Sequence, residues 1–153
     1  MHTVAECLRS QNERGFTLLE LVIALLLVAI LAAIAAPSYR EHVRKTHRKE
    51  AVTALVDLSL RLERFHAKTN AYPATATEAS NLLAAINPPP SFYTLSFENI
   101  GTDSTATTYK IKATRISSAA QASDAECGDY ALTNESRRSV SGTGTLEKCW
   151  PKD

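Results

Sequence analysis

Residues 16–36 read FTLLELVIALLLVAILAAIAA, an apolar stretch interrupted only by Thr17 and the single acid Glu20. As a helix that rises about 1.5 Å per residue, this stretch would be about 31 Å long, enough to cross the hydrocarbon core of a bilayer. The preceding residues 1–15 are mostly polar and end in Arg14-Gly15. A secretory signal has the opposite order, because its apolar part lies before the cleavage site and is removed with it. The sequence therefore predicts a membrane helix that the mature protein retains.

The junction of these two parts carries a short motif. It reads Gly15-Phe16-Thr17-Leu18-Leu19-Glu20 and continues with Leu21-Val22-Ile23. This motif resembles the processing site of type IV prepilins, in which a dedicated peptidase cuts after the glycine on the cytoplasmic side and methylates the new N-terminal residue. The resemblance implies cleavage between Gly15 and Phe16, a leader of residues 1–15 and an N-methylated Phe16. It also implies that helix 16–37 first spans the membrane and later forms the core of a filament.

Glu20 is unfavourable in a membrane helix, because inserting an ionised carboxylate there costs about 2.5–3.5 kcal/mol on insertion scales. The pilin motif implies that Glu20 faces the free amine of Phe16 on a neighbouring subunit. Phe16 and Glu20 would then carry subunit assembly, as an ion pair in which each charge leaves water only with the other. The alternative is that Glu20 reaches the membrane interface or is protonated in the bilayer.

Pro37 follows the alanine-rich end of the apolar stretch and cannot donate a backbone hydrogen bond to the turn before it. It is expected to kink the helix near Ala33. The alternative is that Pro37 opens a second helix at its first turn. Both leave a long helical rod with one weak point.

The composition restricts the remaining chain to one small domain, residues 38–153. Seventeen basic and 16 acidic residues give a formal net charge of +1. Removing the leader takes away two residues of each sign and leaves this net charge unchanged. The net charge therefore predicts no acidic or nucleic-acid partner.

Two of the three cysteines, Cys127 and Cys149, lie far beyond the membrane helix, whereas Cys7 lies in the predicted leader. An even pair in an exported domain predicts a disulfide, which would close a loop of about 23 residues and stabilise the fold by roughly 3 kcal/mol. Residues 38–153 would then lie in an oxidising compartment. The alternative is two free thiols. Cys7 lacks the preceding apolar run of a lipoprotein site.

The charges that flank the membrane helix oppose a topology in which residues 38–153 are exported. Between Arg40 and Glu50 there are five basic residues and two acidic ones, whereas the leader has two of each. The positive-inside tendency alone would keep this side in the cytoplasm, but long domains translocate largely regardless of charge. The leader motif and the cysteine pair both require export. We therefore expect a single-pass inner-membrane protein with a cytoplasmic N-terminus and a periplasmic domain, which later joins an extracellular filament.

An amphipathic helix is predicted over residues 38–70. Its apolar stripe, spaced by four, three, four and three residues, comprises Ala51, Leu55, Leu58, Leu62 and Phe65. The helix should end near Asn70, because Tyr72-Pro73 follows. The connecting segment 71–90 is expected to hold a short helical turn around 78–85 and to close with the extended run Pro88-Pro89-Pro90.

The apolar period changes to two after the prolines, which predicts an antiparallel sheet over 91–141. Strands are expected at 93–98 and 109–114, with a turn at 101–104, and at 130–133 and 138–141. Residues 118–124, which include several Ala and Ser residues, are expected to form an exposed loop. The predicted fold class is α+β, a long N-terminal helix packed on a small antiparallel sheet, with a region 127–149 bounded by the cysteine pair. This is the type IV pilin fold that the resemblance implies.

No set of residues predicts catalysis, a cofactor or a metal, so we do not expect an enzyme. His42 and His47 are five residues apart on a helix and face different directions, which makes them a poor metal pair. Gly142-Thr143-Gly144 lacks the flanking strand and helix of a phosphate loop. The spacing of calcium-loop ligands is absent from Asp124, Glu126 and Asp129.

Three functions fit these features. The resemblance favours a major or minor structural subunit of a type IV pilus, similar to PilE-like pilins; its implied partners are other pilins, the prepilin peptidase and methylase, the inner-membrane assembly platform and, before assembly, membrane lipid. The second function is a minor pilin that contacts DNA during uptake. Its candidate contacts are Arg137, Arg138, Lys148 and Trp150, or else Lys110, Lys112 and Arg115. The third is a type II secretion pseudopilin, which shares the N-terminal motif.

Overall fold

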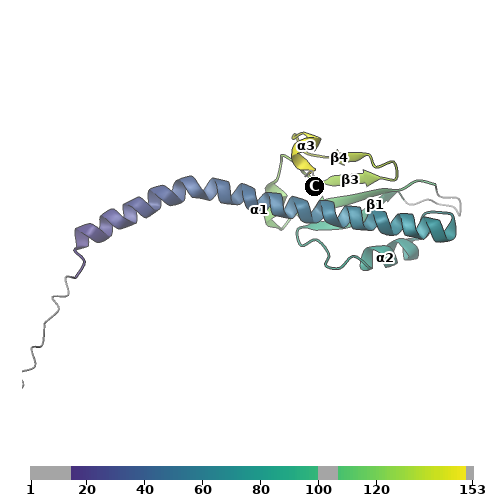
Figure 1. The fold of residues 1–153 in the computed structure, drawn as a ribbon, viewed down its shortest axis with the longest axis horizontal. Helices are drawn as coiled ribbons and strands as arrows, with labels where there is room; N and C mark the ends of the chain where they lie inside the picture. Colours follow the sequence, from purple (N-terminus) through teal and green to yellow (C-terminus); the bar gives the residue numbers. More distant parts are fainter. Residues whose placement is uncertain (1–14, 100–106, 151–153) are drawn as a thin grey trace, which may run out of the picture. The chain divides into compact units, whose positions relative to one another are not determined.

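The structure is a computed structural model that describes residues 15–99 and 107–150. The chain divides into two compact units, Met1–Tyr39 and Arg40–Asp153. One helix, α1 (Leu18–Thr69), contributes residues to both units (Figure 1). The predicted leader up to residue 14 and the predicted turn at 101–104 lie outside the described residues.

The first unit consists, in its described part, mainly of the apolar portion of α1. Its large apolar side chains are exposed, from Val22 at 50% to Phe16 at 83%. A window of 18 residues in α1 reaches a mean hydropathy of 3.0 with none of it buried, so α1 has the length and composition to cross a membrane. Pro37 lies inside α1 and does not begin a second helix, so that alternative is wrong. The expected kink stays a prediction.

The second unit is an antiparallel sheet of four strands with the second half of α1 packed across it (Figure 1). The strands are β1 (Tyr93–Asn99), β2 (Lys110–Arg115), β3 (Tyr130–Thr133) and β4 (Arg138–Val140), and they neighbour one another in chain order. The connections contain α2 (Ala76–Ala84), η1 (Ala120–Ser123) and α3 (Leu146–Cys149). The predicted fold class is confirmed, and the strands lie close to where the sequence places them.

The core lies between α1 and the sheet because each contributes apolar side chains at its own period. The predicted stripe on α1 is buried at Ala51, Leu55, Leu58 and Leu62. The sheet meets it with Tyr93, Ile111, Ala113, Tyr130 and Leu132. Burying a leucine or isoleucine side chain contributes about 1.5–3 kcal/mol, so this stripe fixes which side of α1 faces the sheet.

The segment after α1 is held by local hydrogen bonds. α1 ends as predicted, with Asn70 in the left-handed region at a φ of 58°. A capping box starts α2: Thr75 Oγ1 accepts from Glu78 N–H at 3.2 Å, and the Glu78 carboxylate accepts from Thr75 N–H at 3.1 Å. These bonds fix the start of the short helix that the sequence predicts.

Residues 118–124 form the exposed loop that their composition predicts only in part: Ser118, Ala120, Ala122 and Ser123 are exposed, whereas two other side chains are buried. They contain η1, and Gln121 and Asp124 are each 1% exposed. A partner on α1 explains the burial, because Asp124 accepts two hydrogen bonds of 2.7 Å from Arg48. Composition carries no information about a partner so distant in the sequence.

Candidate assembly segment and charged surfaces

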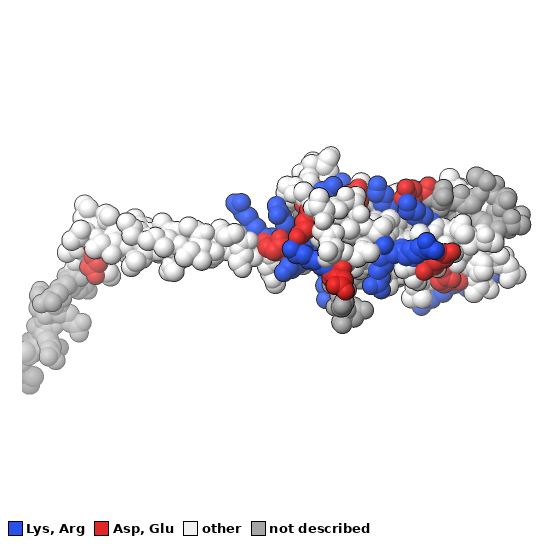
Figure 2. All heavy atoms as spheres, turned by 90° about the horizontal axis from the view of Figure 1, so that it is seen from above, with Lys and Arg blue, Asp and Glu red and all other residues white. Residues whose placement is uncertain are grey.

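The candidate assembly segment, residues 16–37, has an apolar surface on every side. Figure 2 shows this part almost entirely without charged side chains. A helix that is apolar all round needs a membrane or other helices around it. Glu20 is its single acid, and the Glu20 backbone N–H donates to Thr17 Oγ1 at 3.2 Å near the start of α1. Pairing of Glu20 with the Phe16 amine of a second copy stays a prediction.

The predicted disulfide between Cys127 and Cys149 is present. Both cysteines are buried, and their Cα atoms are 5.4 Å apart. Backbone bonds support the same region: Gly142 N–H donates to the Cys127 carbonyl at 3.1 Å, and Gly144 N–H donates to the Glu126 carbonyl at 2.7 Å. The two glycine amides are therefore used by the fold itself, as a turn rather than a phosphate loop.

Trp150 is a core side chain and is 3% exposed. Its ring lies edge-on to Tyr130, with the centroids 5.7 Å apart, and the Arg138 guanidinium lies 5.4 Å from its centroid. Stacking of Trp150 on a nucleic-acid base would require the indole to leave the core. Among the other candidate DNA contacts, Lys148 is paired with Glu126, and Arg137 is paired with Glu135 at 2.8 Å.

A buried ion pair ties α1 to the C-terminal region. Arg48 is 2% exposed and donates two hydrogen bonds of 2.7 Å to the two oxygens of Asp124. The same guanidinium reaches Glu41 and Glu126, each at 3.2 Å. Bidentate pairs of this kind fix orientation as well as distance. The pair therefore positions η1 and the neighbouring disulfide against α1.

The titration behaviour of this cluster follows from its contacts. Burial alone would raise the pKa of Asp124, but hydrogen bonds from Arg48 and from the Cys127 N–H hold this pKa below its ordinary value. The hydrogen bond to Asp124 raises the pKa of Arg48. The hydrogen bond between Lys148 and Glu126 lowers the pKa of Glu126 and raises the pKa of Lys148. These four groups are therefore all charged at neutral pH.

The strand register places basic side chains on the sheet face that points away from α1, which we name the outer face. Lys110 and Lys112 alternate along β2 with the buried Ile111 and Ala113, so both lie on this face. Lys112 is opposite Ala131 of β3, and Ala131 is opposite Ser139 of β4. The side chains beside Lys112 on the outer face, Ala131 and Ser139, are therefore small.

Arg137 adjoins the outer face at the turn before β4. Arg137 and Lys110 line one hollow of about 430 Å³ together with Thr133 and Asn134. The Arg137 side chain is 80% exposed and the Lys110 side chain 40%. The strand pairing thus brings Arg137 close to Lys110 and Lys112 of β2, from which it is distant in the sequence.

Each base of the outer face has an acidic neighbour. Lys110 pairs with Glu98 at 3.0 Å, and Lys112 lies 3.5 Å from Asp129. Figure 2 shows the same mixture of basic and acidic side chains over the second unit, Arg40–Asp153, which we name the head. Exposed pairs such as Lys110–Glu98 contribute about 0–1 kcal/mol, so Lys110 can leave Glu98 to contact an anionic ligand at small cost. Arg115, in contrast, bonds to Asp129 and to the Asp124 carbonyl and serves the fold.

A second charged surface, which we name the cationic groove, lies between α1 and α3. This hollow of about 280 Å³ is lined by His42, Lys45, Thr46, Arg48, Lys49, Lys148 and Cys149. Arg48 and Lys148 have acidic partners. Lys45 and Lys49 are exposed, and neither has an ion-pair partner in the described part of the chain. The groove therefore carries uncompensated positive charge.

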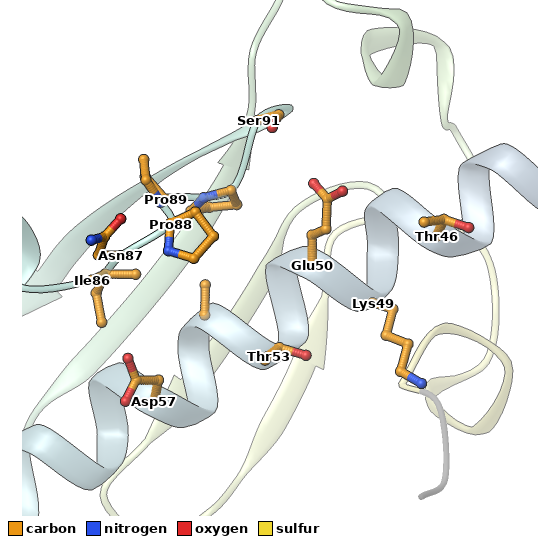
Figure 3. A pocket seen from close by; sticks show the side chains of 12 residues that line it. Thr46, Lys49, Glu50, Thr53, Asp57, Ile86, Asn87, Pro88, Pro89 and Ser91 are labelled. Atoms are coloured by element: carbon orange, nitrogen blue, oxygen red, sulfur yellow. The ribbon is translucent and has the colours of Figure 1, made fainter.

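A third hollow, of about 510 Å³, runs between α1 and residues 86–91 (Figure 3). Ala54, Ile86 and the prolines give it apolar walls, and Figure 3 shows Glu50 and Asp57 projecting from α1 along it. One Glu50 oxygen is buried without a hydrogen-bond partner, and Asp57 is paired with Arg61. Because carboxylates repel phosphate, this groove does not suit nucleic acid.

Metal-ligating side chains do not gather in the structure: over residues 15–99 and 107–150, no group of three or more His, Cys, Asp or Glu side chains is placed to hold a metal ion. His47 stacks on Phe92, with ring centroids 3.6 Å apart. The three acids considered for a calcium loop instead contact Arg48, Lys148 and Arg115.

Comparisons with known proteins agree with this architecture. A family model described as type IV minor pilin ComP, DNA uptake sequence receptor, matches residues 37–131, and the prokaryotic N-terminal methylation motif matches residues 10–36. The chain is 30% identical over 83 residues to the type II secretion system core protein G of Klebsiella michiganensis, over 54% of this chain and 58% of that protein. It is 31% identical over 77 residues to the fimbrial protein EcpC of Eikenella corrodens, over 50% of each. The chain thus spans about half the length of the curated relatives it matches.

The solved structures add evidence on the fold alone. The non-core minor pilin PilV of Neisseria meningitidis matches with a TM-score of 0.51 and 13% identity, over 68% of this chain and 92% of that chain. The methylation motif covers the predicted cleavage junction, and the minor-pilin model covers more than half of the chain. The chain therefore belongs to the family of type IV minor pilins that the ComP model describes.

Proposed function

We propose that this pilin is a minor subunit of a type IV pilus and that it binds duplex DNA through the outer face of its sheet. Before assembly, residues 16–37 hold it in the inner membrane with the N-terminus in the cytoplasm. Prepilin peptidase cuts after Gly15 and methylates Phe16. The assembly platform then transfers the subunit to a filament of pilins, where Glu20 pairs with the Phe16 amine of a neighbour.

The observation that carries the DNA proposal is the register that brings Lys110 and Lys112 to the outer face, next to Arg137. α1 packs on the other face, so assembly through α1 leaves the outer face free for a ligand. The name of the matching family model, a DNA uptake sequence receptor, supports the same ligand. Duplex DNA presents closely spaced phosphates, to which lysine and arginine side chains bind with release of counterions.

The proposed contacts differ from those that the sequence favours first. Trp150 is buried, Arg138 lies over its ring, and Lys148 is held by Glu126. Of those four residues, Arg137 has the geometry of an outer-face contact. Lys110 and Lys112, the second set in the sequence, supply the others, whereas Arg115 is used by the fold.

We expect Lys110→Gln with Arg137→Gln to weaken DNA binding by the full chain in detergent. Log affinity falls with log salt concentration, and each lost phosphate contact makes this slope less steep by about 0.9. The slope of the double variant should therefore be less steep by about 1.8. Mobility shifts of a duplex over a series of salt concentrations measure both quantities. The matched control is Arg64→Gln with Lys68→Gln, which removes the same charge from exposed positions of α1. Equal weakening in the control, or no shift at low salt, contradicts the proposal.

A pseudopilin role is the second candidate, because the chain is similar to type II secretion core protein G over 83 residues. The same titration separates the two roles, since a pseudopilin has no need of DNA affinity. Absence of a shift at low salt would remove the DNA role and leave the pseudopilin role beside that of a purely structural pilus subunit.

A further inference from the structure

We propose that the cationic groove binds the phosphate of anionic phospholipid headgroups while the subunit resides in the membrane. The inference rests on the proposed membrane-anchored state and adds a defined ligand to it. It concerns the basic run from Arg40 to Lys49, which neither filament assembly through residues 16–37 nor DNA binding by the outer face explains.

The basic side chains of the cationic groove outnumber the acidic side chains that contact them. Asp124 neutralises Arg48 through two hydrogen bonds, and Glu126 neutralises Lys148. The remaining acid in contact with these bases is Glu41, 3.2 Å from Arg48. Lys45 and Lys49 line the same hollow, are exposed and have no acidic partner in the described ranges. A phosphate in the groove would supply the missing negative charge and accept hydrogen bonds from both ammonium groups.

The position of the groove residues in the chain selects a lipid headgroup as the source of that phosphate. Lys45 and Lys49 belong to the same helix as the apolar segment, and they follow that segment in sequence. Tyr39, at the end of the first unit, is 70% exposed, and tyrosine is a residue enriched at membrane interfaces. Basic clusters next to a membrane span attract anionic leaflets, at about 1 kcal/mol for each base near the surface. The basic run from Arg40 to Lys49 opposes the expected topology by its charge. Anionic headgroups on the exported side of the membrane would give this run a binding partner there.

DNA fits the groove less well than a headgroup does. The groove lies on the α1 side of the head, between α1 and α3, whereas the outer face lies across the sheet. A small hollow that offers two unpaired lysines suits one phosphate group better than the extended backbone of a duplex. Binding to the groove and binding to the outer face are therefore separable by experiment.

The test uses the full chain reconstituted into vesicles of pure phosphatidylcholine or of equimolar phosphatidylcholine and phosphatidylglycerol. An amine-reactive ester is added, and mass spectrometry of peptides gives the modification rate of each lysine. We expect Lys45 and Lys49 each to react about fivefold more slowly in the anionic vesicles, the factor that corresponds to 1 kcal/mol per base. Lys68, exposed near the end of the same helix, should react at equal rates in both.

A variant shows whether the groove or the general surface potential gives the protection. Lys148 lines the same groove, so in the native chain phosphatidylglycerol should slow its reaction as well, and Lys45→Gln with Lys49→Gln should abolish this protection of Lys148. The control Arg64→Gln with Lys68→Gln removes the same charge outside the groove and should keep it. Inorganic phosphate added to phosphatidylcholine vesicles should leave the rates of Lys45 and Lys49 unchanged, which distinguishes a headgroup from free phosphate.

Several results would overturn the inference. Equal rates for Lys45 and Lys49 in the two kinds of vesicle would show that the groove does not bind a headgroup. Protection of these lysines by duplex DNA in phosphatidylcholine vesicles would assign the groove to DNA. Failure of the chain to float with either kind of vesicle after an alkaline wash would remove the membrane-anchored state itself, and with it the role of the groove. Flotation of the chain without protection of Lys45 and Lys49 would exclude headgroup binding by the groove and leave the membrane-anchored state intact.

Discussion

Arg48→Met is expected to lower the free energy of unfolding by about 3–5 kcal/mol, because it leaves Asp124 as a buried charge without its partner. Methionine keeps much of the aliphatic volume of arginine, so the effect reports the lost charge rather than a cavity. Trp150 is the single tryptophan and is buried near Tyr130, so its fluorescence should follow unfolding of the head in urea.

Two further variants make this test specific. Arg48→Met with Asp124→Asn removes both charges while leaving an oxygen for the Cys127 N–H, which donates to Asp124 at 3.3 Å, and should recover most of the loss. Arg44→Met, one turn earlier on α1, removes a hydrogen bond of 3.1 Å to Ser123 and should cost at most about 1.5 kcal/mol. If Arg48→Met costs no more than Arg44→Met, the pair does not hold the C-terminal region.

The native protein and Arg48→Met should also differ in how their stability depends on pH. In the native protein the pKa of Asp124 is lowered, so the stability it contributes is present above the ordinary carboxylate range and is lost as pH falls through the folded-state pKa. In Arg48→Met, burial should instead raise that pKa. With a raised pKa, Asp124 of the folded variant holds a proton more tightly than Asp124 of the unfolded chain. The stability that this proton binding contributes is present at acidic pH and is lost as pH rises. The two proteins should therefore differ in stability less at acidic pH than at neutral pH.

Glu20→Ala is expected to prevent the subunit from joining filaments. The proposed interface pairs Glu20 with the Phe16 amine of a neighbour among apolar helices. Removing one partner of such a pair costs about 3–5 kcal/mol, because the other charge is buried alone. This corresponds to a loss of about two to four powers of ten in the association constant. The measurement is the amount of subunit in sheared filaments relative to the amount in the membrane.

Thr17→Ala is the matched control for assembly. It removes the hydroxyl that accepts from the Glu20 N–H at 3.2 Å and leaves both proposed charges in place. This variant should enter filaments at a level close to that of the native chain. Incorporation of Glu20→Ala at the native level would show that the carboxylate is not an assembly contact.

The sequence predicts those parts of the fold that local patterns encode. The apolar run 16–36, the stripe from Ala51 to Leu62 and the alternation along β1 and β2 each carry the period of their element, and the structure contains each of them. The disulfide also follows from counting cysteines in an exported domain. These features depend on neighbouring residues or on composition, so no knowledge of the tertiary fold is needed.

The Arg48–Asp124 pair and the burial of Trp150 could not be predicted, because they depend on contacts between distant segments. Asp124 lies in a stretch of small residues that suggests a loop, and its partner Arg48 sits in a basic run that suggests a solvated helix face. Trp150 follows Lys148 closely in sequence and suggests a nucleic-acid contact, yet the fold buries it beside Tyr130. A single buried charge has no periodicity, so only the paired geometry identifies it.

The proposed function requires that processing removes the polar leader and retains the apolar helix for assembly. Mass spectrometry of the N-terminal peptide from membrane-extracted protein tests this requirement. We expect a chain that begins with N-methylated Phe16 and continues through the intact apolar segment. A working protein that still begins at Met1, or one whose chain begins beyond Ala36, would contradict it.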